Sequence, residues 1–169
     1  SAFDDCVRLA QLHIADLEAW VSAEFLTPSS YNYSYGSNPL EANSKSKDLY
    51  LNGELVKELM IPEGVQTIGD YAFVHTSITN VSFPGSVKTI GSYAFSGCSK
   101  LKTVILSNGI TTIEDKAFSN CRQIESLVIP VSVTTIGENA FYGCSALQKI
   151  TFSNGNNLKI ISKSAFEGC

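Results

Sequence analysis

Apolar and polar positions follow one pattern that recurs about every 23 residues along most of this chain. The pair Ala-Phe marks the pattern, and its last five occurrences are separated by 22, 23, 23 and 25 residues. An isoleucine precedes each of these Phe residues by five positions, and a stretch of the form L-x-x-V-x-L follows three of them. Because apolar and polar residues alternate at the end of that stretch, it predicts a short strand with one buried face.

Each recurring unit is expected to form one coil of a right-handed β-solenoid with short strands and little helix. After the main strand come a turn, a second extended piece such as "VKTI" at 87–90, and a tight turn such as "GSYAFSGC" at 91–98. A proline often ends the main strand, since it cannot donate a ladder hydrogen bond. Glycine at 69, 91 and 137 lets the backbone bend where a side chain would obstruct it.

Stacking of the coils is required because a single unit is too short to bury its own core. Equivalent side chains should then lie one strand spacing apart, at about 4.8 Å. The sequence therefore predicts a single column of aromatic rings through the interior, formed by Phe73, Phe95, Phe118, Phe141 and Phe166.

The chain is expected to be a single repeat domain over residues 1–169, with an irregular N-terminal part. Residues 1–14 are the tail of one repeat, and 57–169 are regular repeats of 22–25 residues. Between them, 15–56 should form a degenerate repeat with a helix, a loop and a hairpin. Both ends of the sequence fall inside a repeat, so we expect a fragment of a longer solenoid.

Three local signals divide the degenerate repeat. Asp16 can cap a short helix that ends before Thr27-Pro28. The apolar side of this helix would carry Leu17, Trp20, Val21 and Phe25. The stretch "PSSYNYSYGSNP" reads as a loop, whose three tyrosines pack back on the solenoid or form a recognition surface. Asn-Gly within "LYLNGELV" at 49–56 is a strong hairpin signal.

The motifs "IPEGVQTIGDYAF", "IGSYAFSGCSKLKTV" and "IGENAFYGCSALQKI" resemble the BspA-type leucine-rich repeats of bacterial surface proteins. The resemblance covers essentially the whole chain, and "LHIADLEAWV" at 12–21 with 38–65 resembles an irregular segment of some members. It implies a leucine-rich-repeat solenoid that is secreted or at the cell surface of mucosal bacteria. Members are associated with adhesion to host matrix or epithelial proteins, and the family offers no catalytic residues to carry over.

Composition narrows the classes of partner. Charged residues make up only 17% of the chain and the formal net charge is −4, so nucleic acid is not an expected partner. No apolar run approaches the roughly 18 residues of a membrane helix, so no membrane insertion is expected. The absence of a signal peptide says nothing about the parent protein, because the chain begins within a motif.

Every cysteine of the chain follows an Ala-Phe pair by three positions, at 6, 98, 121, 144 and 169. We expect a column of buried free thiols that pack as small hydrophobic side chains. Disulfide bridges remain an alternative, although parallel side chains make the required dihedral angle awkward. A zinc site needs ligands that converge on one point, which a column does not provide. No cofactor is expected.

No catalytic constellation is visible, so the chain is expected not to be an enzyme. His13 and His75 both read as surface residues without the partners that a catalytic triad needs. Acidic residues recur in the turns and read as solvated positions rather than as paired glycosidase carboxylates.

The outward side of the main strands is the candidate partner-binding surface, because solenoids bind partners on such continuous sheets. Exposed apolar residues within it would form a patch typical of an interface, although β-branched residues also simply suit strands. Gln11 starts the outward positions of the first strand. The candidate positions are His13, Glu58, Met60, Asn80, Ser82, Thr103, Ile105, Ser126, Val128, Lys149 and Thr151.

Two functions fit these features of the sequence. The first is an extracellular or cell-surface module that binds host or matrix proteins or glycans, as an adhesin does. The second is a structural spacer of a larger secreted protein, with no ligand of its own. An apolar outward patch would favour the first.

Overall fold

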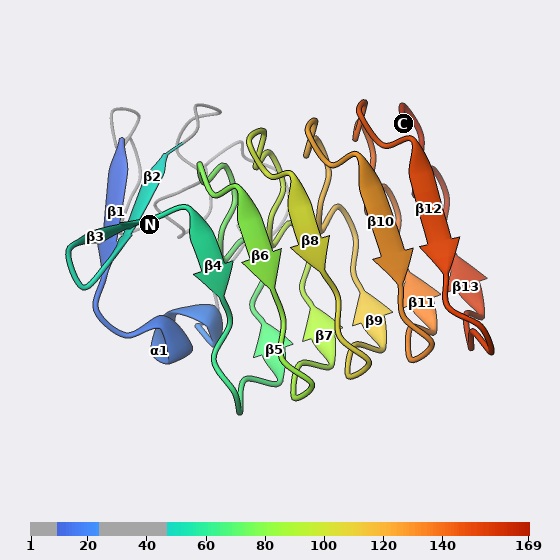
Figure 1. Ribbon diagram of the computed structural model, residues 1–169, viewed down its shortest axis with the longest axis horizontal. Coiled ribbons are helices and arrows are strands. Elements are labelled where there is room, and N and C mark those ends of the chain that lie inside the picture. The colour runs from blue at the N-terminus through green and yellow to red at the C-terminus, as the bar shows by residue number, and fades with distance from the viewer. Residues whose placement is uncertain (1–9, 24–46) are drawn as a thin grey trace, which may run out of the picture.

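The computed structural model describes residues 10–23 and 47–169, and the coils lie side by side along its long axis (Figure 1). Five main strands follow one another along the solenoid, and all the pairs that they form with each other are parallel. They are β4 (Glu58–Met60), β6 (Asn80–Ser82), β8 (Thr103–Ile105), β10 (Ser126–Ile129) and β12 (Lys149–Phe152). They form the sheets β4-β6-β8 and β10-β12, which lie next to each other in Figure 1. The predicted solenoid is confirmed.

A second sheet runs along the lower side of the coils in Figure 1, with the order β13-β11-β9-β7-β5. Its strands have the sequence Thr-Ile in the first four coils and Ile-Ile in the last, and the isoleucines of the first four are buried. They are β5 (Thr67–Ile68), β7 (Thr89–Ile90), β9 (Thr112–Ile113), β11 (Thr135–Ile136) and β13 (Ile160–Ile161).

Hydrogen bonds between coils continue along the Ala-Phe side, although it contains no regular strand. The backbone N–H of each Phe donates to the carbonyl of the Ala in the next coil at 2.8 Å, as Phe95 does to Ala117. The predicted aromatic column is confirmed, with successive ring centroids 5.2–5.3 Å apart from Phe73 to Phe166. The first four rings are fully buried.

Two residues before each Phe, the backbone adopts a left-handed conformation that the sequence does not predict. These residues have φ between 55° and 60° and are not glycines; they are Tyr71, Tyr93, Lys116, Asn139 and Ser164. Such φ values are uncommon for bulky side chains. Ladder bonds hold the conformation, since the backbone N–H at this position reaches the next coil, as from Tyr93 to the Asp115 carbonyl at 3.0 Å.

The cysteines form the predicted column, and the four that the structure describes are unbridged. Cys98, Cys121 and Cys144 are fully buried. Each thiol, and the exposed Cys169 thiol, donates to the Phe carbonyl of the preceding coil with sulfur–oxygen distances of 3.1–3.3 Å. In the coil that lacks a cysteine, Thr76 occupies the equivalent position, but its hydroxyl donates to the carbonyl of Phe73 in its own coil, at 2.9 Å.

The coils need not be equal in length. In register, Ser126 pairs with Lys149 and Thr135 pairs with Ile160. The last coil therefore carries two extra residues between its main strand and its second strand. They lie in a turn in which the Asn156 side chain accepts from the Leu158 N–H at 2.8 Å and Gly155 has φ +74°.

The N-terminal part contains the predicted helix. Strand β1 (Gln11–Ile14) leads into α1 (Leu17–Val21), where the Asp16 carboxylate accepts from the Ala19 N–H at 2.9 Å. Trp20 donates from its indole N–H to the Ala72 carbonyl at 2.8 Å, which attaches the helix to the solenoid. The helix ends at Val21, earlier than expected.

The predicted hairpin also forms, with β2 (Asp48–Leu51) and β3 (Glu54–Val56) pairing antiparallel. Asn52 and Gly53 both have positive φ, at 52° and 86°, as a tight hairpin turn requires. Several sequence predictions lie outside the described residues. They are those for the repeat tail over 1–9 including Cys6, for Phe25 and Thr27-Pro28, and for the tyrosine-rich loop with Tyr31, Tyr33 and Tyr35.

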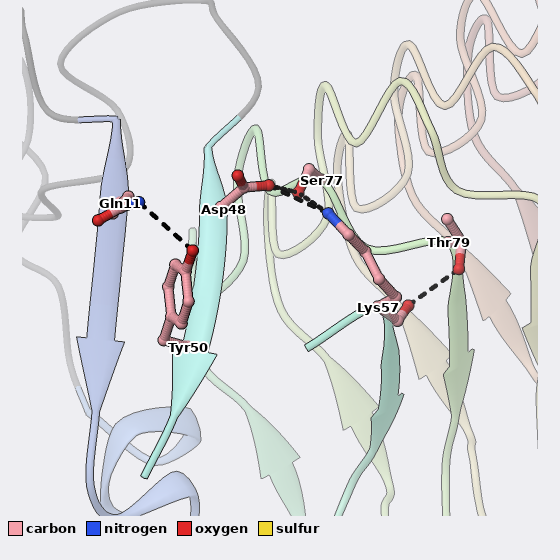
Figure 2. Close-up of polar contacts among 6 residues, drawn as sticks. All are labelled: Gln11, Asp48, Tyr50, Lys57, Ser77 and Thr79. Carbon is pink, nitrogen blue, oxygen red and sulfur yellow. Dashed lines mark hydrogen bonds and ion pairs between the residues drawn. The ribbon is translucent and has the colours of Figure 1, made fainter. Parts of the chain in front are cut away.

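A polar cluster joins this hairpin to the first regular coils (Figure 2). The Lys57 ammonium lies 3.1 Å from a carboxylate oxygen of Asp48 and donates to the Ser77 hydroxyl at 3.1 Å. The Ser77 hydroxyl donates to the same Asp48 oxygen at 2.5 Å. These contacts, first with Ser77 and then with Lys57, hold the pKa of Asp48 below its usual value.

Beside this cluster, Lys47 pairs with the solenoid through its backbone. Its N–H donates to the His75 carbonyl, and its carbonyl accepts from the Ser77 N–H, both at 2.8 Å. His75 is half-buried rather than a plain surface residue as expected from the sequence. Burial, and then the charge of Lys47, lower the pKa of the His75 imidazole.

We expect Phe118→Ala to lower the free energy of unfolding by about 3–5 kcal/mol, because it removes a fully buried ring that is stacked on both sides. Phe166→Ala is the matched control, since Phe166 is half-buried and stacks only on Phe141 in the structure. Urea unfolding measures both. Equal losses for the two variants would contradict the buried column.

We expect Asp48→Asn to lower stability by its full amount above about pH 4 and by progressively less as the pH falls below that. The folded-state pKa of Asp48 lies below the ordinary value of 3.8, so the stabilisation is present above that pH and is lost as the pH falls through the folded pKa. The loss should stay below about 1 kcal/mol, because the Asp48 side chain is 42% exposed.

Urea unfolding of both proteins between neutral pH and pH 3 measures this difference. His75 also disfavours the folded state in acid, but it is present in both proteins and cancels in the comparison. A stability difference that does not change with pH would rule out the ion pair as its cause.

Candidate binding surface

The outward side chains of the main strands form one surface, which we call the outward face. Along each strand the central residue points inward, and Leu59, Val81, Val104 and Leu127 are buried. Their neighbours at both sides point outward. Exposed members of the outward face are Glu58, Met60, Thr103, Ile105, Ser126, Val128, Lys149 and Thr151, whereas Asn80 and Ser82 are half-buried.

Three members of the outward face are large apolar side chains. Met60 is 76% exposed, Ile105 is 58% exposed and Val128 is 56% exposed. Met60 and Ile105 lie in register on either side of Ser82, and Val128 follows on β10. Exposed apolar side chains on successive strands are typical of surfaces that become covered by a partner.

The first residues of the five main strands form a second row on the outward face. This row is polar and has side chains of opposite charge at its two ends. Glu58 begins the row and accepts a hydrogen bond from the Asn80 side-chain amide at 3.2 Å. Thr103 and Ser126 follow without charge, and Lys149 ends the row. A partner would therefore meet an acidic group at one end of this row and a basic group at the other.

Gln11 and His13 lie on a different sheet from Glu58 and Met60, so they are not in register with the main strands. Gln11 pairs in register with Asp48, and His13 pairs with Tyr50 on β2. The His13 and Tyr50 rings stack with their centroids 4.3 Å apart. Figure 2 shows the neighbouring contact, in which Gln11 donates to the Tyr50 hydroxyl at 3.3 Å. The hairpin reverses the chain before β4, so a separate sheet, β1-β2-β3, precedes the main strands.

The polar cluster of Asp48, Lys57 and Ser77 is, among the described residues, the arrangement closest to a catalytic one. A serine beside a lysine can form a nucleophile and its base when the lysine is neutral. Here Lys57 is ion-paired with Asp48, while Ser77 is buried and its hydroxyl donates to Asp48 rather than to a base. This geometry suits a structural link between the hairpin and the coils.

Within residues 10–23 and 47–169, no three His, Cys, Asp or Glu side chains are grouped so that they could hold a metal ion. The same part of the chain contains no helix with the length and apolar character needed to cross a membrane. Burial raises the pKa of the Cys98 and Cys144 thiols to about 12, and it raises that of Cys121 as well. These thiols are therefore protonated and poor metal ligands.

Solved structures with the same fold are bacterial repeat proteins. A leucine-rich repeat protein from T. pallidum is 30% identical with a TM-score of 0.53, over 61% of this chain and 56% of that one. One from Bacteroides capillosus is 31% identical with a TM-score of 0.52, over 58% and 78%. The pneumococcal vaccine antigen PcpA is 27% identical with a TM-score of 0.50, over 66% and 26%.

This chain thus spans little more than half the length of the T. pallidum protein. A search of curated proteins finds no match. The profile of the BspA-type leucine-rich repeat region matches residues 43–169, in six copies. That match covers both the hairpin and all the regular coils, so the chain belongs to the BspA-type leucine-rich repeat family.

Proposed function

We propose that this chain is an extracellular or cell-surface module that binds a host or matrix protein or glycan through the outward face. The observation that carries this proposal is the exposure of Met60, Ile105 and Val128 on a continuous strand surface. Leucine-rich repeats are in general interaction modules, and a solenoid presents an extended surface for that purpose. The likeness to a pneumococcal vaccine antigen supports a location at the cell surface.

The rigidity of the surface supports this role. The backbone of the main strands is held by parallel ladders and by the buried columns behind them. Short, mostly β-branched or small side chains cover much of the outward face, so little side-chain entropy is lost when a partner binds. The apolar side chains would supply the contact area, and the charges of Glu58 and Lys149 would orient the partner.

The module acts without catalysis or a cofactor in this proposal. Solenoids of this family are typically not enzymes, and in the described residues the Cys98, Cys121 and Cys144 thiols are buried and Lys57 is ion-paired with Asp48. Membrane insertion and nucleic-acid binding play no part in the proposed activity, in keeping with the net charge of −4.

A structural spacer is the second candidate, favoured by a different observation. Besides the three apolar residues, every position of the outward face is polar, as a solvated surface would be. The continuous ladders between coils would also suit a stiff rod. A spacer needs no partner at the outward face, so the two functions differ in a measurable way.

We expect the protein to be retained by at least one member of a panel of extracellular matrix proteins and host glycans. The variants Ile105→Glu and Val128→Lys should each weaken that binding roughly 10-fold or more, because a charge would have to be desolvated within the contact. Biolayer interferometry against the immobilised panel measures retention and affinity.

Tyr142→Glu is the matched control, since Tyr142 is exposed but lies on the Ala-Phe side of the coils. It should leave binding unchanged, and thermal unfolding should show that all three variants fold. Retention of nothing on the panel would favour the spacer. Loss of binding in the control as well would place the contact elsewhere on the solenoid.

A further inference from the structure

Met60 is the single methionine of the chain and the most exposed large hydrophobic side chain that the structure describes. It lies on the first strand of the sheet β4-β6-β8, and its partner in register is the small residue Ser82. Its thioether sulfur is therefore open to solvent and to small solutes. A thioether reacts with hydrogen peroxide without prior deprotonation, so exposure is the main requirement.

Thiols would normally react first, but the fold protects three of them. Cys98, Cys121 and Cys144 are fully buried, and each donates to a Phe carbonyl of the preceding coil. Their raised pKa values keep them in the thiol form, whereas peroxide reacts with the thiolate. The usual order of reactivity between cysteine and methionine is thereby reversed within the coils.

We propose that Met60 is a peroxide-oxidation site through which oxidants switch the outward face from apolar to polar. In the reaction, the Met60 sulfur takes one oxygen atom from hydrogen peroxide and forms the S–O bond of a sulfoxide. The O–O bond breaks, the sulfur is oxidised by two electrons, and the peroxide is reduced to one molecule of water. The consequence for partner binding rests on the proposed function, whereas the chemistry does not.

The position of Met60 gives the modification its effect. The sulfoxide is polar and a strong hydrogen-bond acceptor, so the most exposed apolar side chain of the outward face would become hydrated. Nothing inside the solenoid would change, because the side chain points away from the core. The switch would therefore alter the surface while leaving the stability of the coils nearly unchanged.

The test treats the folded protein with hydrogen peroxide, traps the remaining thiols under denaturing conditions, and maps the modified peptides by mass spectrometry over time. Met60 should gain one oxygen atom roughly tenfold faster than Cys98, Cys121 or Cys144 is oxidised. The exposed Cys169 is followed separately. Oxidation of a buried cysteine before Met60, or an unmodified Met60, would overturn the proposal.

A second measurement asks whether the surface changes, with an alkyl hydrophobic-interaction column as the probe. Oxidised wild-type protein should elute earlier than untreated protein, and untreated Met60→Gln should do the same. Met60→Leu should show no peroxide-dependent shift, and unchanged elution of the oxidised wild type would also overturn the proposal. If both readouts succeed and no matrix component binds, the proposed function fails but the oxidation site stands.

Discussion

The distance between equivalent residues of neighbouring coils, here called the step, is the constraint on which the rest of this structure depends. Backbone hydrogen bonds of 2.8 Å from each Phe to the Ala of the next coil recur on the side that lacks regular strands. Parallel strand pairing joins neighbouring coils on the other two sides. Ring centroids 5.2–5.3 Å apart follow from this step, so each coil must place a side chain of the same size at the same point.

The repeated features could be predicted because they depend on local patterns that recur in register. Period-two alternation predicted the inward Val104 and the outward Ile105, and the spacing of Ala-Phe predicted the aromatic and thiol columns. The left-handed backbone at Tyr93 and Lys116 could not be predicted, because the intrinsic preference of these residues argues against it. Hydrogen bonds from the next coil override that preference, and only the assembled array provides them.

In the N-terminal part, the periodicity of the sequence does not predict how the strands are arranged. Residues 1–14 read as the tail of a repeat, so the sequence groups His13 with the outward positions of the main strands. A hairpin reverses the chain between β1 and β4, and His13 pairs in register with Tyr50 on β2. The sequence also does not predict the cluster of Asp48, Lys57 and Ser77, because residues 48 and 77 come together only through the packing of segments that are distant in the sequence.

The two extra residues in the turn between β12 and β13 show how such an array can diversify. The Phe141 and Phe166 rings keep their 5.3 Å separation despite this longer coil. Length changes at that corner are thus uncoupled from the interior, so a duplicated unit can acquire insertions there without mispairing. A gene of this kind can vary its loops between copies while preserving the periodic scaffold, which is the property that makes tandem duplication a workable route to new surfaces.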